Sequence, residues 1–339
     1  MKLLTVAIPC YNSAEYMSKA IESVLVGGED VEILIVDDGS TKDETSRIAD
    51  DYAAKYPTVI RAIHKENGGH GDAVMTGIRN ATGTYFKVVD SDDWLDAEAF
   101  RRVLGRLKTV NDSGEELDLF LSNYVYDKVG AKHKFVVRYN HALPENVIFG
   151  WRDTRHFRVG QYIQMHSIIY RTQLLKDCGL ELPRHTFYVD ELYAYVPLTR
   201  VEKMMYMNEN VYHYYIGRED QSVQENIMIG RIDQAIRVHE MMVDSVEIMD
   251  ITDVHKRNYM LRYLEIITTV CSVLLLKSGT PENRQKKRRL WANIHARQPR
   301  VYVILKRRFL GRFTNLPGRL GRKATLAGYR VSRKIFGFN

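Results

Sequence analysis

The first third of the chain alternates short apolar runs with stretches of helical spacing, and this alternation limits the folds open to it. Strands are predicted for the apolar runs at 3–8, 31–36, 59–64 and 85–89. Helices are predicted for the intervening stretches at 14–25, 41–56 and 73–81. Strands that alternate with helices are typical of right-handed βαβ units. The predicted fold class is therefore α/β, with a mostly parallel sheet flanked by helices.

Polar clusters follow three of these predicted strands, at 9–12, 37–40 and 90–93. Ligands of parallel sheets bind at the carboxyl ends of the strands, so we expect the three clusters to meet at one edge. In the third cluster, Asp90 and Asp92 are separated by one residue and can converge on Mg²⁺ or Mn²⁺, which take oxygen ligands. The alternative is helix capping, by Asp93 or Asp96.

The other polar segments also allow two interpretations. A carboxylate after the second strand can accept a hydrogen bond from a nucleobase, or it can cap the next helix with Gly39 making the turn. Capping is favoured for Asp37. The glycine-rich loop at 67–72 permits close approach to a ligand but lacks the P-loop pattern, and no G-x-G-x-x-G follows the first strand. A P-loop nucleotidase and a Rossmann dehydrogenase are both disfavoured.

The pattern changes after about residue 117. A hairpin around Gly130 is predicted from the stretches at 118–128 and 133–139. Further strands are predicted at 168–170 and 211–215, and two amphipathic helices at 224–248 and 254–276.

Cysteine content and hydropathy exclude several classes of protein. The three cysteines are odd in number and far apart, which argues against a disulfide-stapled secreted domain and against a thiolate zinc site. The N-terminus turns polar too soon for a signal peptide. The longest apolar stretch, 266–276, is shorter than the roughly 20 residues that span a bilayer. We expect a soluble cytosolic chain, or one that lies on a membrane without crossing it.

The net charge of +7 conceals a strong asymmetry. Residues 281–339 hold 17 Lys and Arg and one acidic residue, Glu282, whereas residues 1–280 carry a net charge of −9. Basic residues with interleaved aromatics suit an amphipathic helix on anionic lipid, and the same composition suits nucleic acid. A solvated tail or an oligomer contact is a third interpretation. The acidic body and the lack of a nucleic-acid motif favour the membrane, and no nucleic-acid partner is expected.

Taken together, four ordered motifs resemble those of the family 2 glycosyltransferases of the GT-A fold: 6–12, 35–43, 67–69 and 83–94. Four motifs in order are far more specific than any one of them. The resemblance covers about 3–125, extends to about 222 and is silent on the rest. The predicted organisation is a GT-A domain at 1–222, with a nucleotide-binding half at 1–116 and an acceptor half at 117–222, a helical extension at 223–280 and a basic amphipathic tail at 281–339.

The resemblance implies a nucleotide-sugar donor, usually a UDP-sugar, held across the strand ends. Pro9 and Tyr11 would line the nucleoside pocket, and Asp38 would read the base. The nucleotide-binding residues implied in this way are Pro9, Tyr11, Asp38, Gly69 and Asp90. Asp92, with Asp90 beside it, would coordinate the Mg²⁺ or Mn²⁺ that neutralises the charge on the diphosphate leaving group.

Such enzymes invert the sugar and need a general base at the start of a helix downstream of the metal motif. Asp190 matches the second position of the family's Glu-Asp pair, although Val189 stands where the Glu is usual. That departure makes Glu191 the alternative base. The structural interpretation is that both carboxylates only complement the dipole of their helix.

Histidines and an arginine complete the candidates. His213 or Arg218 could approach the diphosphate from the aromatic stretch at 212–222, or that stretch is an edge strand that packs its tyrosines. His70 and His166 are interpreted as ordinary surface or core histidines.

The sequence thus predicts a metal-dependent inverting glycosyltransferase that acts on a hydroxyl of a glycan or lipid-linked acceptor, in surface polysaccharide or glycolipid assembly of the cell envelope. It would be cytoplasmic and peripheral on the inner face of the cell membrane. One alternative is a sugar-phosphate nucleotidyltransferase, which would want a glycine-rich basic loop after the first strand. The other is a sugar-nucleotide-binding scaffold without catalysis, against which the intact acidic residues argue.

Overall fold

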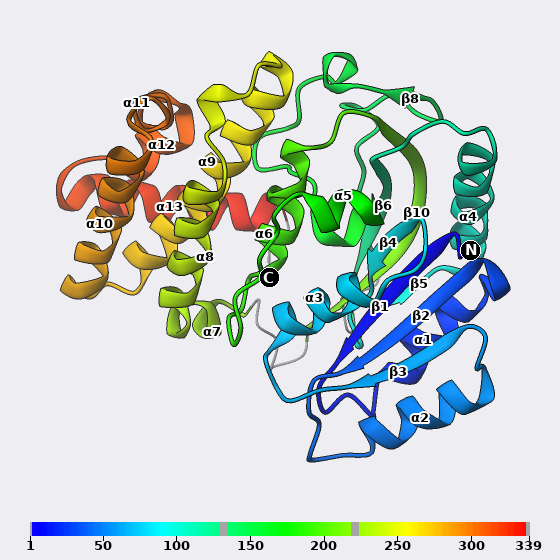
Figure 1. Ribbon diagram of the computed structural model, residues 1–339. Helices are drawn as coiled ribbons and strands as arrows, with labels where there is room; N and C mark the ends of the chain where they lie inside the picture. Colours follow the sequence, from blue (N-terminus) through cyan, green and yellow to red (C-terminus); the bar gives the residue numbers. More distant parts are fainter. Residues whose placement is uncertain (1, 129, 131–133, 218–223, 337–339) are drawn as a thin grey trace. The chain divides into compact units, whose positions relative to one another are not determined.

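The computed structural model describes residues 2–128, 130, 134–217 and 224–336 (Figure 1). The chain forms two compact units, Met1–Ile216 and Gly217–Asn339. The boundary predicted after residue 222 lies outside the described residues. The first unit is mixed α/β, and the described part of the second unit consists of helices and their connections.

The first unit contains the parallel sheet that the periodicity predicts. Its first four strands are β1 (Leu4–Cys10), β2 (Val31–Asp37), β3 (Ile60–His64) and β4 (Tyr85–Val88). They are parallel and lie in the order β3-β2-β1-β4 (Figure 1). β1 continues through Pro9 to Cys10, two residues beyond the end of the strand predicted at 3–8.

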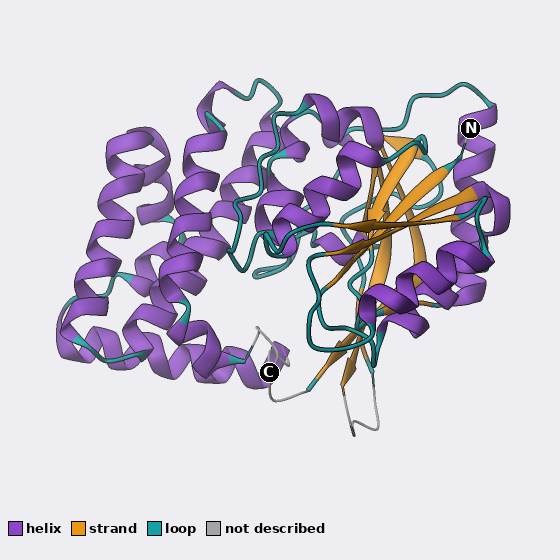
Figure 2. Cartoon of the chain, turned by 60° about the horizontal axis from the view of Figure 1, so that its bottom comes forward, coloured by secondary structure: helices purple, strands orange, loops and turns teal. Residues whose placement is uncertain are grey.

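Helices cover both faces of this sheet (Figure 2). They are α1 (Met17–Leu25), α2 (Thr45–Lys55), α3 (His70–Asn80) and α4 (Ala97–Asp112). Alternation along β1 places Val6 and Ile8 in the core formed with α1 and α4, while Ala7 faces Gly77 of α3 on the other side. The result is a three-layer arrangement with the sheet in the middle.

Two of these helices begin later than predicted, because the residues before them form a turn. The backbone N–H groups of Thr41 and Lys42 donate to Asn12 Oδ1 (3.2 and 3.1 Å), so α2 begins only at Thr45. Ala14 N donates to Asp43 Oδ2 (2.9 Å), and α1 begins at Met17. A side-chain cap appears at α4 instead.

Asp96 is the N-cap of α4, and its side chain accepts a hydrogen bond from Ala99 N (2.9 Å). This confirms one of the two capping residues that the sequence suggested. The other residue, Asp93, is not the N-cap of α4; its carboxylate accepts hydrogen bonds from Tyr212 and Tyr215.

The second half of the unit extends the sheet with strands of both directions. β9 (Ile168–Arg171) is antiparallel to β4 and to β6 (Leu119–Lys128), and β10 (Met204–Ile216) is parallel to β6. β5 (Trp94–Leu95) and β8 (Ile148–Phe149) are antiparallel to β10. β7 (Phe135–Val137) pairs with β6 and confirms the predicted hairpin within the described residues.

Strand β10 is much longer than the predicted segment at 211–215. Its middle carries Asn208, Glu209 and Asn210, and the register to β6 shifts on both sides of Asn210. These polar residues interrupt the apolar pattern, so the sequence predicts only the end of the strand. Asn123 Nδ2 of β6 satisfies them by donating to the side-chain oxygens of Asn208 (2.9 Å) and Asn210 (3.0 Å).

Short helices connect the later strands. The α-helical ones are α5 (Thr172–Asp177) and α6 (Asp190–Tyr195). Single 3₁₀ turns occur at Gly28–Asp30, Trp151–Asp153, Met165–Ser167 and Pro197–Thr199. The turn at Met165–Ser167 and the helix α6 both contribute to the site described below.

The second unit consists of helices packed around α9. Its α-helices are α7 (Glu225–Gly230), α8 (Ile232–Ser245), α9 (Val254–Lys277), α10 (Pro281–Arg297), α11 (Pro299–Arg307), α12 (Phe309–Thr314) and α13 (Gly318–Phe336), with a 3₁₀ turn at Ile248–Asp250. The helix predicted at 224–248 is divided in two. Gly230 is the last residue of α7, and Arg231 leaves helical geometry, which fits the weak helix propensity of glycine.

The described part of the basic segment, 281–336, is mostly helical, but much of its apolar content belongs to the core of the second unit. Leu290, Trp291, Ile294, Val301 and Leu305 are all buried. These residues therefore stabilise the fold and are not available to a lipid surface.

Helix α9 is long and apolar enough to cross a membrane by length and composition alone. However, 83% of its most apolar window is buried inside the structure. Such burial is typical of the central helix of a helical bundle, and α9 is the central helix of the second unit.

A close contact between α3 and β1 provides a test of this packing. Gly77→Ala should destabilise the protein, because the new Cβ would lie 2.6 Å from Ala7 Cβ in the middle of the sheet. We expect the free energy of unfolding to fall by about 1–3 kcal/mol in urea denaturation. The matched control is Gly105→Ala in α4, where no atom lies within 4 Å of the new Cβ. It should raise stability by up to about 1 kcal/mol. If both variants changed the free energy of unfolding in the same direction, the close contact between α3 and β1 would be contradicted.

Candidate active site

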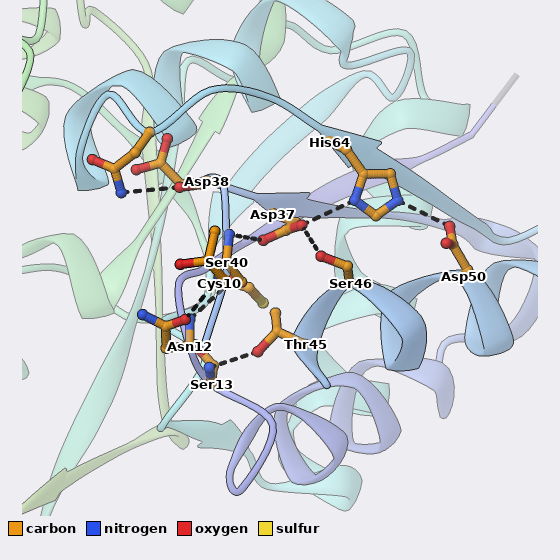
Figure 3. Close-up of polar contacts among 12 residues, drawn as sticks. Cys10, Asn12, Ser13, Asp37, Asp38, Ser40, Thr45, Ser46, Asp50 and His64 are labelled. Carbon is orange, nitrogen blue, oxygen red and sulfur yellow. Dashed lines mark hydrogen bonds and ion pairs between the residues drawn. The ribbon is translucent and has the colours of Figure 1, made fainter. Parts of the chain in front are cut away.

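The polar clusters after β1, β2 and β4 meet at one edge of the sheet, as predicted. Asn12 N donates to Ser40 Oγ (2.9 Å), which joins the first loop to the second. Ser91 Oγ donates to Ser13 Oγ (2.9 Å), which joins the third loop to the first. Asn12 adopts a positive φ of 48°, a conformation that asparagine tolerates better than most residues. Figure 3 shows the first two of these loops and their contacts.

Asp37 is a buried structural carboxylate at the end of β2 (Figure 3). Its Oδ1 accepts a hydrogen bond from Ser40 N (3.0 Å), and its Oδ2 accepts from Ser46 Oγ (2.5 Å) and contacts His64 Nδ1 (3.0 Å). Burial opposes ionisation of Asp37, but these hydrogen bonds hold its pKa below the usual range. Asp37 is not the N-cap of α2, which is Glu44, yet it anchors the first turn of that helix through Ser46.

Asp38 lies beside it, and three donors hold its carboxylate. Lys65 Nζ (2.6 Å) and Gly68 N (2.9 Å) donate to its Oδ1, and Gly69 N (2.7 Å) donates to its Oδ2. A carboxylate oxygen has two lone pairs, so Oδ2 can still accept one more N–H. This arrangement fixes the carboxylate that the resemblance assigns to base recognition.

The glycine-rich loop is packed against the segment that leads to α6. Gly69 has a φ of 84°, and a Cβ there would lie 3.0 Å from His185 N. His185 N also donates to Gly68 O (2.7 Å). The glycines therefore serve a close approach between two parts of the chain that are more than a hundred residues apart.

Asp90 forms the centre of an acidic cluster after β4. Its Oδ1 contacts His70 Nε2 (2.8 Å), at the first residue of α3. Burial opposes ionisation of Asp90, but the charge and the hydrogen bond of His70 leave its pKa lowered. Burial likewise lowers the pKa of His70, yet Asp90, together with the more distant Asp190 and Asp92, leaves it raised. His70 is thus an electrostatic link between the acidic cluster and α6.

Asp93 is buried and turned away from solvent. Tyr212 Oη donates to its Oδ2 (2.5 Å), and Tyr215 N donates to its Oδ1 (2.8 Å). Burial, with Asp92 and Asp90 nearby, raises the pKa of Asp93 well above its usual value. Asp93 therefore ties β10 to the acidic loop, while Asp92 is half-buried in the same turn.

His166 lies next to this cluster, in the 3₁₀ turn before β9. One of its ring nitrogens and one oxygen each of Asp90 and Asp93 all lie within 4.8 Å of one another. His166 is only 7% exposed, and its Nδ1 has no hydrogen-bond partner. Burial lowers its pKa to about 4, so the ring is neutral and its free lone pair suits a metal ion. The residues around it fit a divalent cation.

Aromatic rings and a lysine hold His166 in place. The ring stacks on Tyr214 (centroids 4.4 Å apart) and meets Tyr212 edge to face (4.9 Å). Lys87 Nζ donates to the carbonyl oxygens of His166 (2.8 Å) and Ile168 (3.3 Å). Lys87 is wholly buried in β4, and burial lowers its pKa to about 7.

The two candidate bases occupy the start of α6. Asp190 is its first residue, and burial raises the pKa of its carboxyl, with Asp90 adding to the shift and His70 opposing it. The adjacent Glu191 accepts a hydrogen bond from Tyr162 Oη (3.1 Å). Tyr188, just upstream, has a φ of 67°, an unusual conformation of the kind that gathers at functional sites.

The remaining predicted residues either lie apart from the acidic cluster or fall outside the residues that the structure describes. Pro9 is buried within β1, whereas Tyr11 is 50% exposed just beyond it. His213 follows Tyr212 in β10 and so points to the opposite face of the sheet, where it stacks on Trp94 (5.3 Å) and contacts Asp127 (3.1 Å). The structure does not bring His213 to the cluster. Arg218 lies outside the described residues.

Comparison with known proteins agrees with this geometry. The family model described as glycosyl transferase family 2 matches residues 5–158. Those residues belong to glycosyl transferase family 2. They contain β1–β4 and every acidic residue of the cluster after β4.

Relatives and solved structures extend the comparison. The Bacillus subtilis protein named "Uncharacterized glycosyltransferase EpsJ" is 41% identical over 102 residues, which is 30% of this chain and 29% of that protein. S. aureus TarS 1–349 in complex with UDP-GlcNAc superposes with a TM-score of 0.69 and 18% identity, over 98% of this chain and 92% of that one. The mannosyltransferase PcManGT from Pyrobaculum calidifontis, in complex with GDP-Man and Mn²⁺, superposes with a TM-score of 0.51 and 13% identity. The superposition covers 97% of this chain and 87% of that one. These superpositions establish the GT-A fold.

Four contributors to this site were not found from the sequence: His70, Lys87, His166 and Tyr212. The sequence assigns His70 and His166 no special role, because neither stands in a recognised motif. Lys87 stands inside a predicted strand of the central sheet. That position alone indicates that its side chain is buried and needs hydrogen-bond acceptors.

Asp37 provides a pH test of the loop structure. Its ionised carboxylate should stabilise the protein above its unfolded pKa of about 3.9, and this contribution should be lost as the pH falls through the lower folded value. Asp37→Asn should cost about 1–3 kcal/mol at neutral pH and progressively less in acid, in urea denaturation. Asp50→Asn, which alters the exposed partner of the same His64, is the control and should cost less than about 0.5 kcal/mol. An equal cost at all pH values would contradict the assignment.

Proposed function

We propose that the protein is a metal-dependent, inverting glycosyltransferase that moves a sugar from a UDP-sugar to a hydroxyl group. The observation that carries the proposal is the convergence of two sites in a family 2 domain. The acidic cluster around Asp90 provides a donor site, and the half-buried carboxylate of Asp190 is coupled to it through His70. A donor site and a base in electrostatic contact are what a transfer reaction requires.

Donor recognition is assigned to the edge of β1, β2 and the glycine-rich loop. Asp38, held by Lys65 and two backbone N–H groups, would accept an N–H of the base on Oδ2. The exposed ring of Tyr11 would flank the nucleoside. The complex of TarS with UDP-GlcNAc, a protein of the same fold, supports a uridine nucleotide.

The residues that would hold a divalent cation are Asp90, Asp92 and His166. Asp90 and His166 belong to the cluster within 4.8 Å, and Asp92 is added from the resemblance. Two carboxylates and an imidazole form a donor set that Mn²⁺ accepts, and the Mn²⁺ complex of PcManGT supports this choice of ion. When bound, the cation neutralises the charge that develops on the diphosphate leaving group. Asp93 is not assigned as a ligand, because burial beside Asp92 and Asp90 raises its pKa well above the usual value, which disfavours the charged form that binds a cation.

Asp190 is assigned as the general base. Its carboxylate would accept the proton of the acceptor hydroxyl as that oxygen bonds to the anomeric carbon of the sugar. The bond from this carbon to the diphosphate oxygen breaks with its electron pair, so UDP leaves from the opposite face and the configuration inverts. Burial raises the pKa of Asp190, which moves it toward the value that suits a base near neutral pH.

The acceptor is proposed to be a glycan or a lipid-linked glycan of the cell envelope, reached from the cytoplasmic face of the membrane. The basic composition of the second unit supports this location. The matched region covers about 29% of the EpsJ chain, so the acceptor and the pathway are proposed for this protein independently of that relative.

The cation assignment can be tested by calorimetry of UDP binding with and without Mn²⁺. Asp92→Ala and His166→Ala should each weaken the Mn²⁺-dependent binding at least tenfold while leaving metal-free binding unchanged. Asp112→Ala and His156→Ala, which alter exposed residues of the same types, are the controls and should bind like the parent. Parent-like binding by His166→Ala would remove His166 from the donor set. Tight UDP binding without any sugar transfer would favour the scaffold alternative.

The base assignment can be tested by comparing Asp190→Asn with Glu191→Gln. Asp190→Asn should lower kcat by about 10² to 10⁴ with UDP affinity unchanged, because it removes only the proton acceptor. The parent rate should fall as the pH drops through the raised pKa of Asp190, and this acid limb should vanish in the variant. Glu191→Gln should cost much less. If Glu191→Gln is the inactive variant, the base lies one position later.

A further inference from the structure

Helix α13 is fixed to the second unit by one of its faces. A Cβ at Gly321 would lie 2.6 Å from the carbonyl carbon of Leu316, and one at Gly328 would lie 2.3 Å from Phe313 Cζ. Thr325 Oγ1 donates to the carbonyl oxygen of Phe313 (2.7 Å). Positions 321, 325 and 328 share one face of a helix, so these contacts determine how α13 is rotated (Figure 1, red).

A second face of the same helix is apolar and open to solvent. Leu320, Ala324, Ala327 and Val331 recur at intervals of four, three and four residues, and all are exposed. The exposed fraction is 82% for Leu320 and 57% for Val331. We call these four residues the α13 stripe. Contiguous exposed apolar surface on a folded protein marks an interaction site.

The neighbouring helix α12 adds an exposed aromatic ring. Phe309 is 73% exposed and stacks on Phe313 (centroids 6.1 Å apart), which in turn packs against Gly328. Phe309 is thus a further exposed apolar side chain, on a helix that packs against α13.

The charges around the α13 stripe determine which partner fits. Arg319, Lys323 and Arg330 are exposed on α13 beside the stripe. The sequence has no acidic residue after Glu282. A second copy of the helix would bring these cations against each other, whereas an anionic lipid surface offers both an apolar interior and negative headgroups.

We propose that α13 lies on an anionic membrane surface, with the α13 stripe and Phe309 at the acyl boundary and the flanking cations among the headgroups. The apolar residues of α10 and α11 are excluded from this role, because they are buried in the core of the unit. The proposal narrows a basic segment of 59 residues to one helical face. It holds whether or not the transferase assignment is correct.

The test is cosedimentation of the full chain with vesicles of phosphatidylcholine, with or without phosphatidylglycerol. The parent should bind the anionic vesicles only, and binding should weaken with salt. Removing three cations (Arg319→Gln, Lys323→Gln and Arg330→Gln) should weaken binding on the order of 100-fold, since each contributes roughly fivefold. The matched control removes three exposed cations of the first unit (Lys42→Gln, Lys55→Gln and Arg101→Gln) and should change binding less than about twofold.

The apolar contribution is tested separately. Leu320→Gln combined with Val331→Gln should weaken binding about tenfold or more. The control is Val254→Gln, which replaces a 52% exposed valine at the start of α9. The substituted side chains are exposed, so the thermal midpoint should not change. Parent-like binding by the α13 variants would overturn the proposal. So would a parent dimer in light scattering that the Leu320→Gln, Val331→Gln variant converts to monomer, because the occupant of the face would then be a second copy.

Discussion

Several carboxylates lie together at one edge of the parallel sheet, and much of the first unit is arranged to provide them with hydrogen-bond and charge partners. An ionised carboxylate taken out of water is costly unless charges or hydrogen bonds compensate it. The partners are supplied from distant parts of the chain: His64 for Asp37, Lys65 for Asp38 and His70 for Asp90. Each partner stands at the end of β3 or the start of α3. The loops of the site are therefore held by the charges that also give it its chemistry.

The glycine-rich loop extends this constraint to the acceptor side. The N–H groups of Gly68 and Gly69 hold Asp38, while the carbonyl of Gly68 accepts the N–H of His185. His185 lies five residues before Asp190. One loop thus contacts both Asp38, proposed to recognise the base of the donor, and the segment that leads to Asp190, proposed as the general base. Any side chain at Gly69 would push these two parts away from each other.

Periodicity predicted the elements of the first half well, because βαβ units are built from local patterns. It failed where long-range pairing decides the structure. The middle of β10 carries Asn208 and Asn210, which are satisfied by Asn123 of β6, and no local pattern encodes that partner. His166 is a similar case, since its position depends on Lys87 in β4 and on the tyrosines of β10.

The three aspartates after β4 show why a motif alone does not assign roles. Asp93 is pinned by Tyr212 and Tyr215, and burial among its acidic neighbours raises its pKa, so it is the carboxyl that most readily stays protonated. The burial that raises this pKa disfavours a negative charge on Asp93. Asp90 stays ionised because His70 contacts it. These opposite shifts favour Asp90 over Asp93 as the charged neighbour of His166, although both lie within 4.8 Å of it.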